Sequence, residues 1–192
     1  DPGYPCNRHF LSSFNAEGLL VPVGAEQNYQ LTPSLVEEYW DSRTRGILVA
    51  SPANPTGSIL SPETIRELGE VVRKKDGILM VDEIYQGLVY EEHTSGSALV
   101  QAPEAIVINS FSKYFGMTGW RLGWVVVPEV LVADLEKLAQ NLFICPSSIA
   151  QEAALVAFDP ESIATMEAQK AEFAIRRDYL VPALKELGFE IP

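Results

Sequence analysis

The sequence NSFSKYFGMTGWRLGWVVV occupies residues 109–127. An apolar run at residues 105–108 leads into it and is typical of a buried strand. Lys113 therefore falls where a strand ends and a loop begins, which is the usual place for a reactive side chain on a rigid scaffold. A second apolar run at residues 124–127 predicts another strand directly after the loop.

The loop that follows the lysine contains three glycines within eight residues: Gly116, Gly119 and Gly123. Glycine permits a positive φ angle or a close approach between backbones, and ordinary loops rarely need that three times in so short a span. Arg121 adds a planar fork of N–H donors that suits a phosphate group. The loop therefore predicts an anion site beside Lys113.

Two other interpretations compete for this stretch. A lysine in a loop is most often a solvated surface charge. Residues 110–113 also fit the S-x-x-K signature of serine acyl enzymes, but that chemistry requires Ser-Asp-Asn and Lys-Thr-Gly companion motifs. The sequence contains neither companion, which argues against an acyl enzyme.

Composition and charge exclude several classes of partner. The 192 residues include 47% hydrophobic and 21% charged side chains, and the formal net charge is −12. Nucleic acid or an anionic membrane would require a basic face, so neither is expected as a partner. No apolar run has the length of a membrane span, and no signal peptide opens the sequence.

The cysteine and histidine content gives two further expectations. Cys6 and Cys145 are too few and too far apart for a disulfide framework, so a cytoplasmic protein is expected. With only His9 and His93 besides, no structural metal site is expected.

Apolar runs and helical periodicity predict strands that alternate with helices. Strands are predicted at residues 19–23, 47–50, 78–81, 105–108 and 124–127, the second with the apolar character of a strand buried on both faces. Helices are predicted to begin at residues 32–33 and 61–62 and to cover residues 130–143, 149–158 and 160–187. Pro182 is expected to kink or restart the last of these helices, and Gly188 is expected to cap it. A polar loop is predicted at residues 91–97. This order predicts an α/β fold, a three-layer arrangement with a mostly parallel sheet and helices on both faces.

Polar side chains follow three of the predicted strands. Asn54 comes after the first buried strand, Asp82 and Tyr85 after the second, and Ser110 and Lys113 after the third. Taken singly, these are ordinary turn, cap or core residues. Ligands of parallel sheets bind outside the carboxyl ends of the strands, so a single site could receive all of these groups. A pyridoxal phosphate site needs such a set: an amine, an acidic partner for the ring nitrogen, and anion donors.

The motifs at these strand ends resemble those of class I/II aminotransferases, which are fold type I pyridoxal phosphate enzymes. The resemblance rests on ANPTG, DEIYQGLVYE and SFSKYFGMTGWRLG, with DPGYP upstream and PSSIAQEAAL downstream, in this order and spacing. It covers almost the whole chain.

The resemblance implies a role for each matching residue. Lys113 would form the Schiff base with the cofactor and carry the proton of the reaction. Asp82 would pair with the ring nitrogen, while Asn54 and Tyr85 would bind the phenolic oxygen. Tyr4 matches the aromatic residue that stacks on the ring face.

The phosphate site follows from the same resemblance. Ser110, Ser112 and Arg121 would hold the phosphate, with Arg121 as a bidentate donor. The implied activity is a double displacement that moves an amino group between an amino acid and a 2-keto acid.

The resemblance also implies that the sequence is part of a longer protein. Residues 1–187 would form part of the large cofactor-binding domain, and residues 188–192 would begin a small C-terminal domain. The relatives are homodimers, and their substrate-carboxylate arginine would lie beyond residue 192. The strand that would precede residue 1 belongs between residues 19–23 and the rest of the sheet, so a gap or a rearranged edge is expected there.

Three alternatives remain open. The same cofactor motifs serve lyases and decarboxylases, because residues on the substrate side set the outcome. An aminotransferase-like effector domain of a transcription regulator would share them too. Residues 1–192 could also fold without being active on their own.

Overall fold

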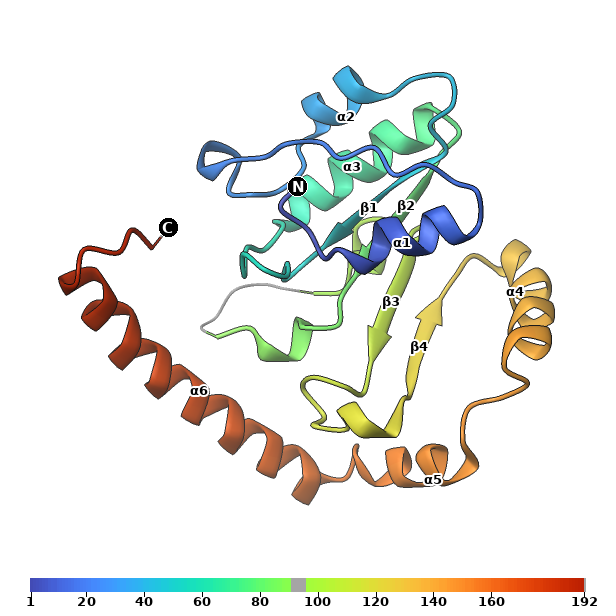
Figure 1. The fold of residues 1–192 in the computed structure, drawn as a ribbon. Helices are drawn as coiled ribbons and strands as arrows, with labels where there is room; N and C mark the ends of the chain where they lie inside the picture. Colours follow the sequence, from blue (N-terminus) through green and yellow to red (C-terminus); the bar gives the residue numbers. More distant parts are fainter. Residues whose placement is uncertain (91–95, 192) are drawn as a thin grey trace.

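The computed structural model describes residues 1–90 and 96–191, and a four-stranded sheet lies at its centre (Figure 1). The strands are β1 Gly46–Ala50, β2 Ile78–Asp82, β3 Ile106–Ser110 and β4 Gly123–Val126, in the order β1-β2-β3-β4. β1, β2 and β3 are parallel, and β4 is antiparallel to β3. The mostly parallel sheet with helices that the sequence predicts is confirmed.

One face of the sheet forms the main core. Alternate strand residues point to this face, and Val49, Leu79, Val81 and Val107 are buried there. α3, Pro62–Lys74, packs on them through its own buried residues Ile65, Leu68, Val71 and Val72. Apolar residues that repeat every second position in the strands thus pack against apolar residues that repeat about every 3.6 positions in α3, as in other α/β cores.

The two helices over this face begin where the sequence predicts. Thr32 accepts a hydrogen bond from Leu35 N–H ahead of α2, Pro33–Tyr39, and Ser61 accepts one from Thr64 N–H ahead of α3. Each cap is followed by a proline in the first turn, whose missing N–H would have no helical partner there.

The opposite face of the sheet is less well covered. Leu48 and Ile108 on this face are each 37% exposed, so the prediction that the 47–50 strand is buried on both faces is wrong. Val125 of β4, which pairs with Ile108, is 49% exposed on this face. Trp124 and Val126 pair with Asn109 and Val107, so they lie on the α3 side of the sheet, where they are 37% and 39% exposed. Helices therefore cover the α3 face over β1, β2 and β3 but leave it partly open at β4, whereas the opposite face keeps substantial apolar surface.

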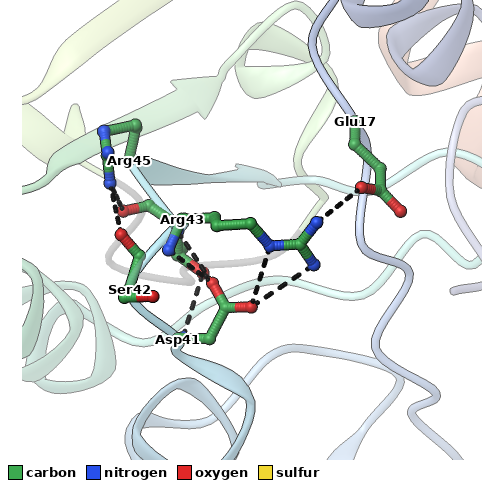
Figure 2. Close-up of polar contacts among 6 residues, drawn as sticks. Glu17, Asp41, Ser42, Arg43 and Arg45 are labelled. Atoms are coloured by element: carbon green, nitrogen blue, oxygen red, sulfur yellow. Dashed lines mark hydrogen bonds and ion pairs between the residues drawn. The ribbon is translucent and has the colours of Figure 1, made fainter.

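A turn of charged residues leads into β1 (Figure 2). Asp41 Oδ1 accepts hydrogen bonds from the backbone N–H groups of Arg43 at 2.8 Å and Thr44 at 3.0 Å, which holds the pKa of Asp41 below its usual value. Arg43 also pairs with Glu17 at 3.3 Å, but both side chains are well exposed. Because exposed ion pairs contribute little, the turn around Asp41 does more to order this loop than the ion pair.

The remaining helices are α1 Cys6–Ser13, α4 Glu129–Leu142, α5 Ser148–Val156 and α6 Pro160–Glu186. α4, α5 and α6 lie within one or two residues of the predicted ranges. α5 joins a second core, in which Ala150, Ala154 and Ala157 pack with Phe111 and Leu122 of the loop that carries Lys113. α6 extends away from the sheet in Figure 1, and none of its residues is buried in the described structure.

α6 ends as predicted but does not break as predicted. The helix runs through Pro182 without a restart. At its end Gly188 has a φ of +89°, and the N–H groups of Gly188 and Phe189 bond to the carbonyls of Lys185 and Leu184. This is a Schellman motif, in which a glycine in the left-handed region satisfies the last carbonyl groups.

The strand predicted at residues 19–23 is absent, and this prediction is wrong. The segment is irregular and lies outside the sheet; the described backbone contacts to it run between Asp1 and the residues Val21 and Val23. Without a neighbouring strand, an extended segment cannot complete its hydrogen bonds as a ladder.

Part of one predicted loop falls outside the described structure. Of the loop predicted at residues 91–97, residues 91–95, including His93, lie outside the described residues. Among the described residues, no helix combines the length and the apolar character that a bilayer span requires.

We expect Leu68→Ala to lower the free energy of unfolding by about 2–5 kcal/mol, because Leu68 is 0% exposed and its removal leaves a cavity between α3 and the sheet. Chemical denaturation of the purified protein measures the change. Val130→Ala, at a residue that is 82% exposed, is the matched control and should shift stability by less than about 0.5 kcal/mol. Equal effects for the two variants would contradict this description of the core.

Candidate active site

Three neighbouring strand ends form the site, because their parallel register places them side by side. Ala50 pairs with Asp82, and Asp82 pairs with Ile108. The loops that leave β1, β2 and β3 consequently start at the same edge of the sheet, where ligands of such folds bind. Each loop carries polar side chains that the sequence singles out.

Asn54, Tyr85 and Lys113 are brought together from the three loops. Asn54 Nδ2 donates a hydrogen bond to the Tyr85 hydroxyl at 3.4 Å, and Lys113 Nζ lies 5.3 Å from the centre of the Tyr85 ring. All three residues are partly buried. An amine, a phenol and an amide thus face a common space, with the amine held over an aromatic ring.

Asp82 is the last residue of β2, at the same edge. Burial raises the pKa of its carboxyl group, and the hydrogen bond that Asp82 accepts from Ile84 N–H at 3.0 Å offsets only part of this. A carboxylate whose pKa is raised by burial is stabilised by a cationic partner. The protonated ring nitrogen of a bound cofactor would be such a partner.

Tyr4 lies near this group but is largely exposed. A hydrogen bond with Cys6 raises the pKa of Tyr4, and the charges of Tyr85 and Asp82 raise it further. Tyr4 therefore lies close enough to both residues for their charges to act on it.

Ser110 and Ser112 form a compact hydroxyl pair at the end of β3. Their Oγ atoms lie 2.8 Å apart, Ser110 Oγ accepts the N–H of Ser112 at 2.9 Å, and it also bonds to the carbonyl oxygen of Leu122 at 3.1 Å. Hydroxyl groups held in this way, beside a turn that carries a lysine, are suited to bind an anion.

Arg121 stands apart from the hydroxyl pair. Its backbone is left-handed, with a φ of 53°, and its side chain donates to the Thr118 carbonyl at 2.9 Å and lines an open pocket with Phe143 and Cys145. Among the described contacts, none joins its guanidinium to Ser110 or Ser112. The structure therefore places Arg121 on the same loop without bringing its donors to the predicted phosphate site.

Two of the three loop glycines are required for the reasons that the sequence predicts, a positive φ angle or a close approach between backbones. Gly116 has a φ of +66°, and a Cβ at Gly123 would lie 2.7 Å from the carbonyl oxygen of Asn109. Gly119 has neither a positive φ nor a close neighbour, so the prediction is wrong for this residue.

Comparison with known proteins connects this geometry to a family. The sequence profile described as "Aminotransferase class I and II" matches residues 1–192. The chain belongs to the class I and II aminotransferases. It is 42% identical over 190 residues to a valine–pyruvate aminotransferase of Mycobacterium tuberculosis, a match that covers 98% of this chain and 49% of the relative.

Solved aminotransferases share the fold. A crystal structure of an aminotransferase from Mycobacterium tuberculosis superimposes with a TM-score of 0.94 at 40% identity and covers 100% of this chain and 52% of its own. A variant of the Thermus thermophilus aspartate aminotransferase gives 0.93 at 29% identity and covers 99% and 53%. The chain thus spans about half the length of the relatives it matches.

Gln30 supports the site, and the sequence alone did not reveal it. Its side chain is 7% exposed, and its Nε2 group lies 3.0 Å from the carbonyl oxygens of Ala50 and Ser58 and 3.2 Å from Ser58 Oγ. These bonds join the two ends of the loop that carries Asn54. A glutamine in an irregular segment has no periodic signature, so only the contact itself identifies it.

Glu83 is a second such residue. It is 3% exposed and accepts hydrogen bonds from Ala98 N–H at 2.5 Å and Ser97 Oγ at 3.2 Å. Burial raises the pKa of its carboxyl group, and the nearby charge of Asp82 adds a smaller increase. Glu83 therefore ties the loop after Asp82 to the turn that precedes β3.

The raised pKa of Asp82 gives a pH-dependent prediction. A carboxyl group whose pKa is higher in the folded state favours folding most below its unfolded pKa of about 3.9, and this contribution is lost as the pH rises through the folded value. We expect Asp82→Asn to stabilise the cofactor-free protein at pH 7, with a gain that shrinks as the pH falls toward about 4.

Denaturation at both pH values tests this, with Asp134→Asn on the exposed face of α4 as the control. A gain for Asp82→Asn that is the same at pH 7 and near pH 4 would show that desolvation of the charge is not its cause.

Proposed function

We propose that the whole protein is an aminotransferase that moves an amino group between an amino acid and a 2-keto acid with pyridoxal phosphate as cofactor. The observation that carries the proposal is the placement of Lys113 Nζ 5.3 Å from the Tyr85 ring, with Asn54 bonded to the Tyr85 hydroxyl and Asp82 at the adjacent strand end. Membership of the aminotransferase family supports it, and so do relatives named as aminotransferases.

The residues present fit this cofactor group by group. Lys113 would hold its carbonyl carbon, Asp82 its ring nitrogen, and Asn54 with Tyr85 its phenolic oxygen. Tyr4 would cover the ring, and Ser110 and Ser112 would bind its phosphate. When bound, pyridoxal phosphate supplies an electron sink that makes the α-proton of an amino acid removable.

We assign Arg121 to the phosphate as well, from its place on the loop that carries Ser110, Ser112 and Lys113. Its guanidinium uses one donor in the contact with the Thr118 carbonyl oxygen. A phosphate beside the hydroxyl pair would offer the bidentate geometry that a guanidinium prefers.

The chain's own groups have defined tasks in transamination. Lys113, once free of the cofactor, would take the proton from the substrate α-carbon as the neutral amine and then, as the ammonium, would deliver it to the carbon of the cofactor that Lys113 had held. Asp82 would remain ionised because a protonated ring nitrogen compensates for its burial. The hydrogen bond from Asn54 would keep the Tyr85 hydroxyl in one orientation while the proton moves.

Substrates, partners and domain limits extend the proposal. The Mycobacterium tuberculosis relative is named for valine and pyruvate, so this is the first substrate pair to test.

We propose a homodimer in a reducing compartment; both cysteines are free, as such a compartment allows. Residues 1–187 would belong to the large domain and residues 188–192 to the start of the small one.

Lys113→Ala in the full-length enzyme is expected to remove the cofactor's lysine-bound absorbance and to lower transamination of pyruvate by valine at least about 100-fold, because both attachment and proton transfer are lost. Borohydride reduction followed by peptide mass spectrometry locates the cofactor adduct. Lys74→Ala, an exposed lysine of α3, is the matched control and should keep both the adduct and the rate. A reducible adduct that persists in Lys113→Ala would contradict the assignment.

A further inference from the structure

Tyr114, the residue after Lys113, connects three parts of the molecule. Its ring lies against the backbone of Gly87, in the short helical turn Gln86–Leu88 that follows Tyr85. Its hydroxyl donates to Glu167 Oε1 of α6 at 2.5 Å. Burial and this hydrogen bond together raise the pKa of Tyr114 to about 12, so the hydroxyl stays protonated as the donor.

The contact with Gly87 leaves no room for a larger residue. A Cβ at this position would lie 2.4 Å from Tyr114 Cγ and 2.7 Å from its Cβ and Cδ2. Rotation about χ1 could move Cγ and Cδ2, but the Cβ atom of Tyr114 is fixed by its own backbone and would keep its contact at 2.7 Å. The ring and the glycine therefore fix the distance between the two loops at one point.

That point lies next to the reactive groups on both sides. Gly87 is two residues from Tyr85, and the turn between them is closed by a 2.8 Å bond from Leu88 N–H to the Tyr85 carbonyl. Tyr114 adjoins Lys113, whose carbonyl accepts Gly116 N–H at 3.0 Å. Each loop is therefore held by a backbone hydrogen bond between the contact and the site.

We propose that Tyr114 is a positioning residue: packed on Gly87 and anchored to α6 through Glu167, it sets the separation between the Lys113 amine and the Tyr85 hydroxyl. This inference rests on the proposed function. A shift of the amine relative to the hydroxyl changes the hydrogen bonding of the cofactor that Lys113 would carry, and with it the pH at which the lysine–cofactor linkage titrates. Misplacement of a reacting group also lowers the rate of the chemical step more than substrate binding.

The test compares Gly87→Ala with Gly119→Ala, both in the full-length enzyme. Gly119 lies in the loop that carries Lys113, and a Cβ added there would have no neighbour within 4 Å. Gly87→Ala should lower kcat roughly 10- to 100-fold with a much smaller change in KM, and should shift the pH midpoint of the lysine–cofactor absorbance by about half a unit or more. Gly119→Ala should match the unsubstituted enzyme in both.

Two variants of the tyrosine keep the test decisive if Gly87→Ala fails to fold. Tyr114→Ala should shift the absorbance midpoint and lower kcat, and Tyr114→Phe, which keeps the ring on Gly87, should recover most of both. Equal behaviour of the two variants would assign the effect to the hydroxyl and Glu167 instead of the ring contact, and wild-type midpoints and kcat in all variants would overturn the inference.

The borohydride-reduced adduct at Lys113 separates this inference from the proposed function. An adduct in every variant together with an unchanged midpoint leaves the function standing and removes the role of Tyr114. An absent adduct in the unsubstituted enzyme overturns both.

Discussion

The parallel register of β1, β2 and β3 is the constraint on which the site depends. Ala50, Asp82 and Ile108 lie side by side, so three loops that are far apart in sequence leave the sheet at one edge. A shift by a single residue would turn each strand over and bury its polar end in the core. The apolar face that packs on α3 prevents this shift, because Val49, Val81 and Val107 would then face the other side. Core packing on one face of the sheet thus fixes the chemistry at its edge.

Much of this could be predicted from the sequence, because the information is local. Apolar runs located the four strands, cap and proline pairs located the starts of α2 and α3, and polar residues after the runs located Asn54, Asp82, Tyr85, Ser110 and Lys113. The strand predicted at residues 19–23 fails for a non-local reason, since an extended segment becomes a strand only beside a partner. Leu48 and Ile108 remain partly exposed for the same reason, because burial depends on what covers the other face.

The parts of the site that could not be predicted are held by long-range polar contacts and by backbone conformation. Gln30 reaches across 28 residues to Ser58, and Glu83 reaches across 15 to Ala98. Neither contact leaves a periodic pattern in the sequence. The left-handed backbone of Arg121, which directs its side chain toward Thr118, is likewise unexpected for an arginine. The roles of these side chains toward a cofactor stay predictions.

The continuity of α6 through Pro182 has a mechanical consequence. Its 27 residues form a helix about 40 Å long, which is hydrogen-bonded to Tyr114 through Glu167 in its N-terminal third and capped at its C-terminal end by Gly188. Proline lacks the N–H that would bond to the carbonyl of Asp178, so the last two turns of α6 have one backbone hydrogen bond fewer. Bending of the helix is therefore easiest on the C-terminal side of Glu167, away from the contact with Tyr114.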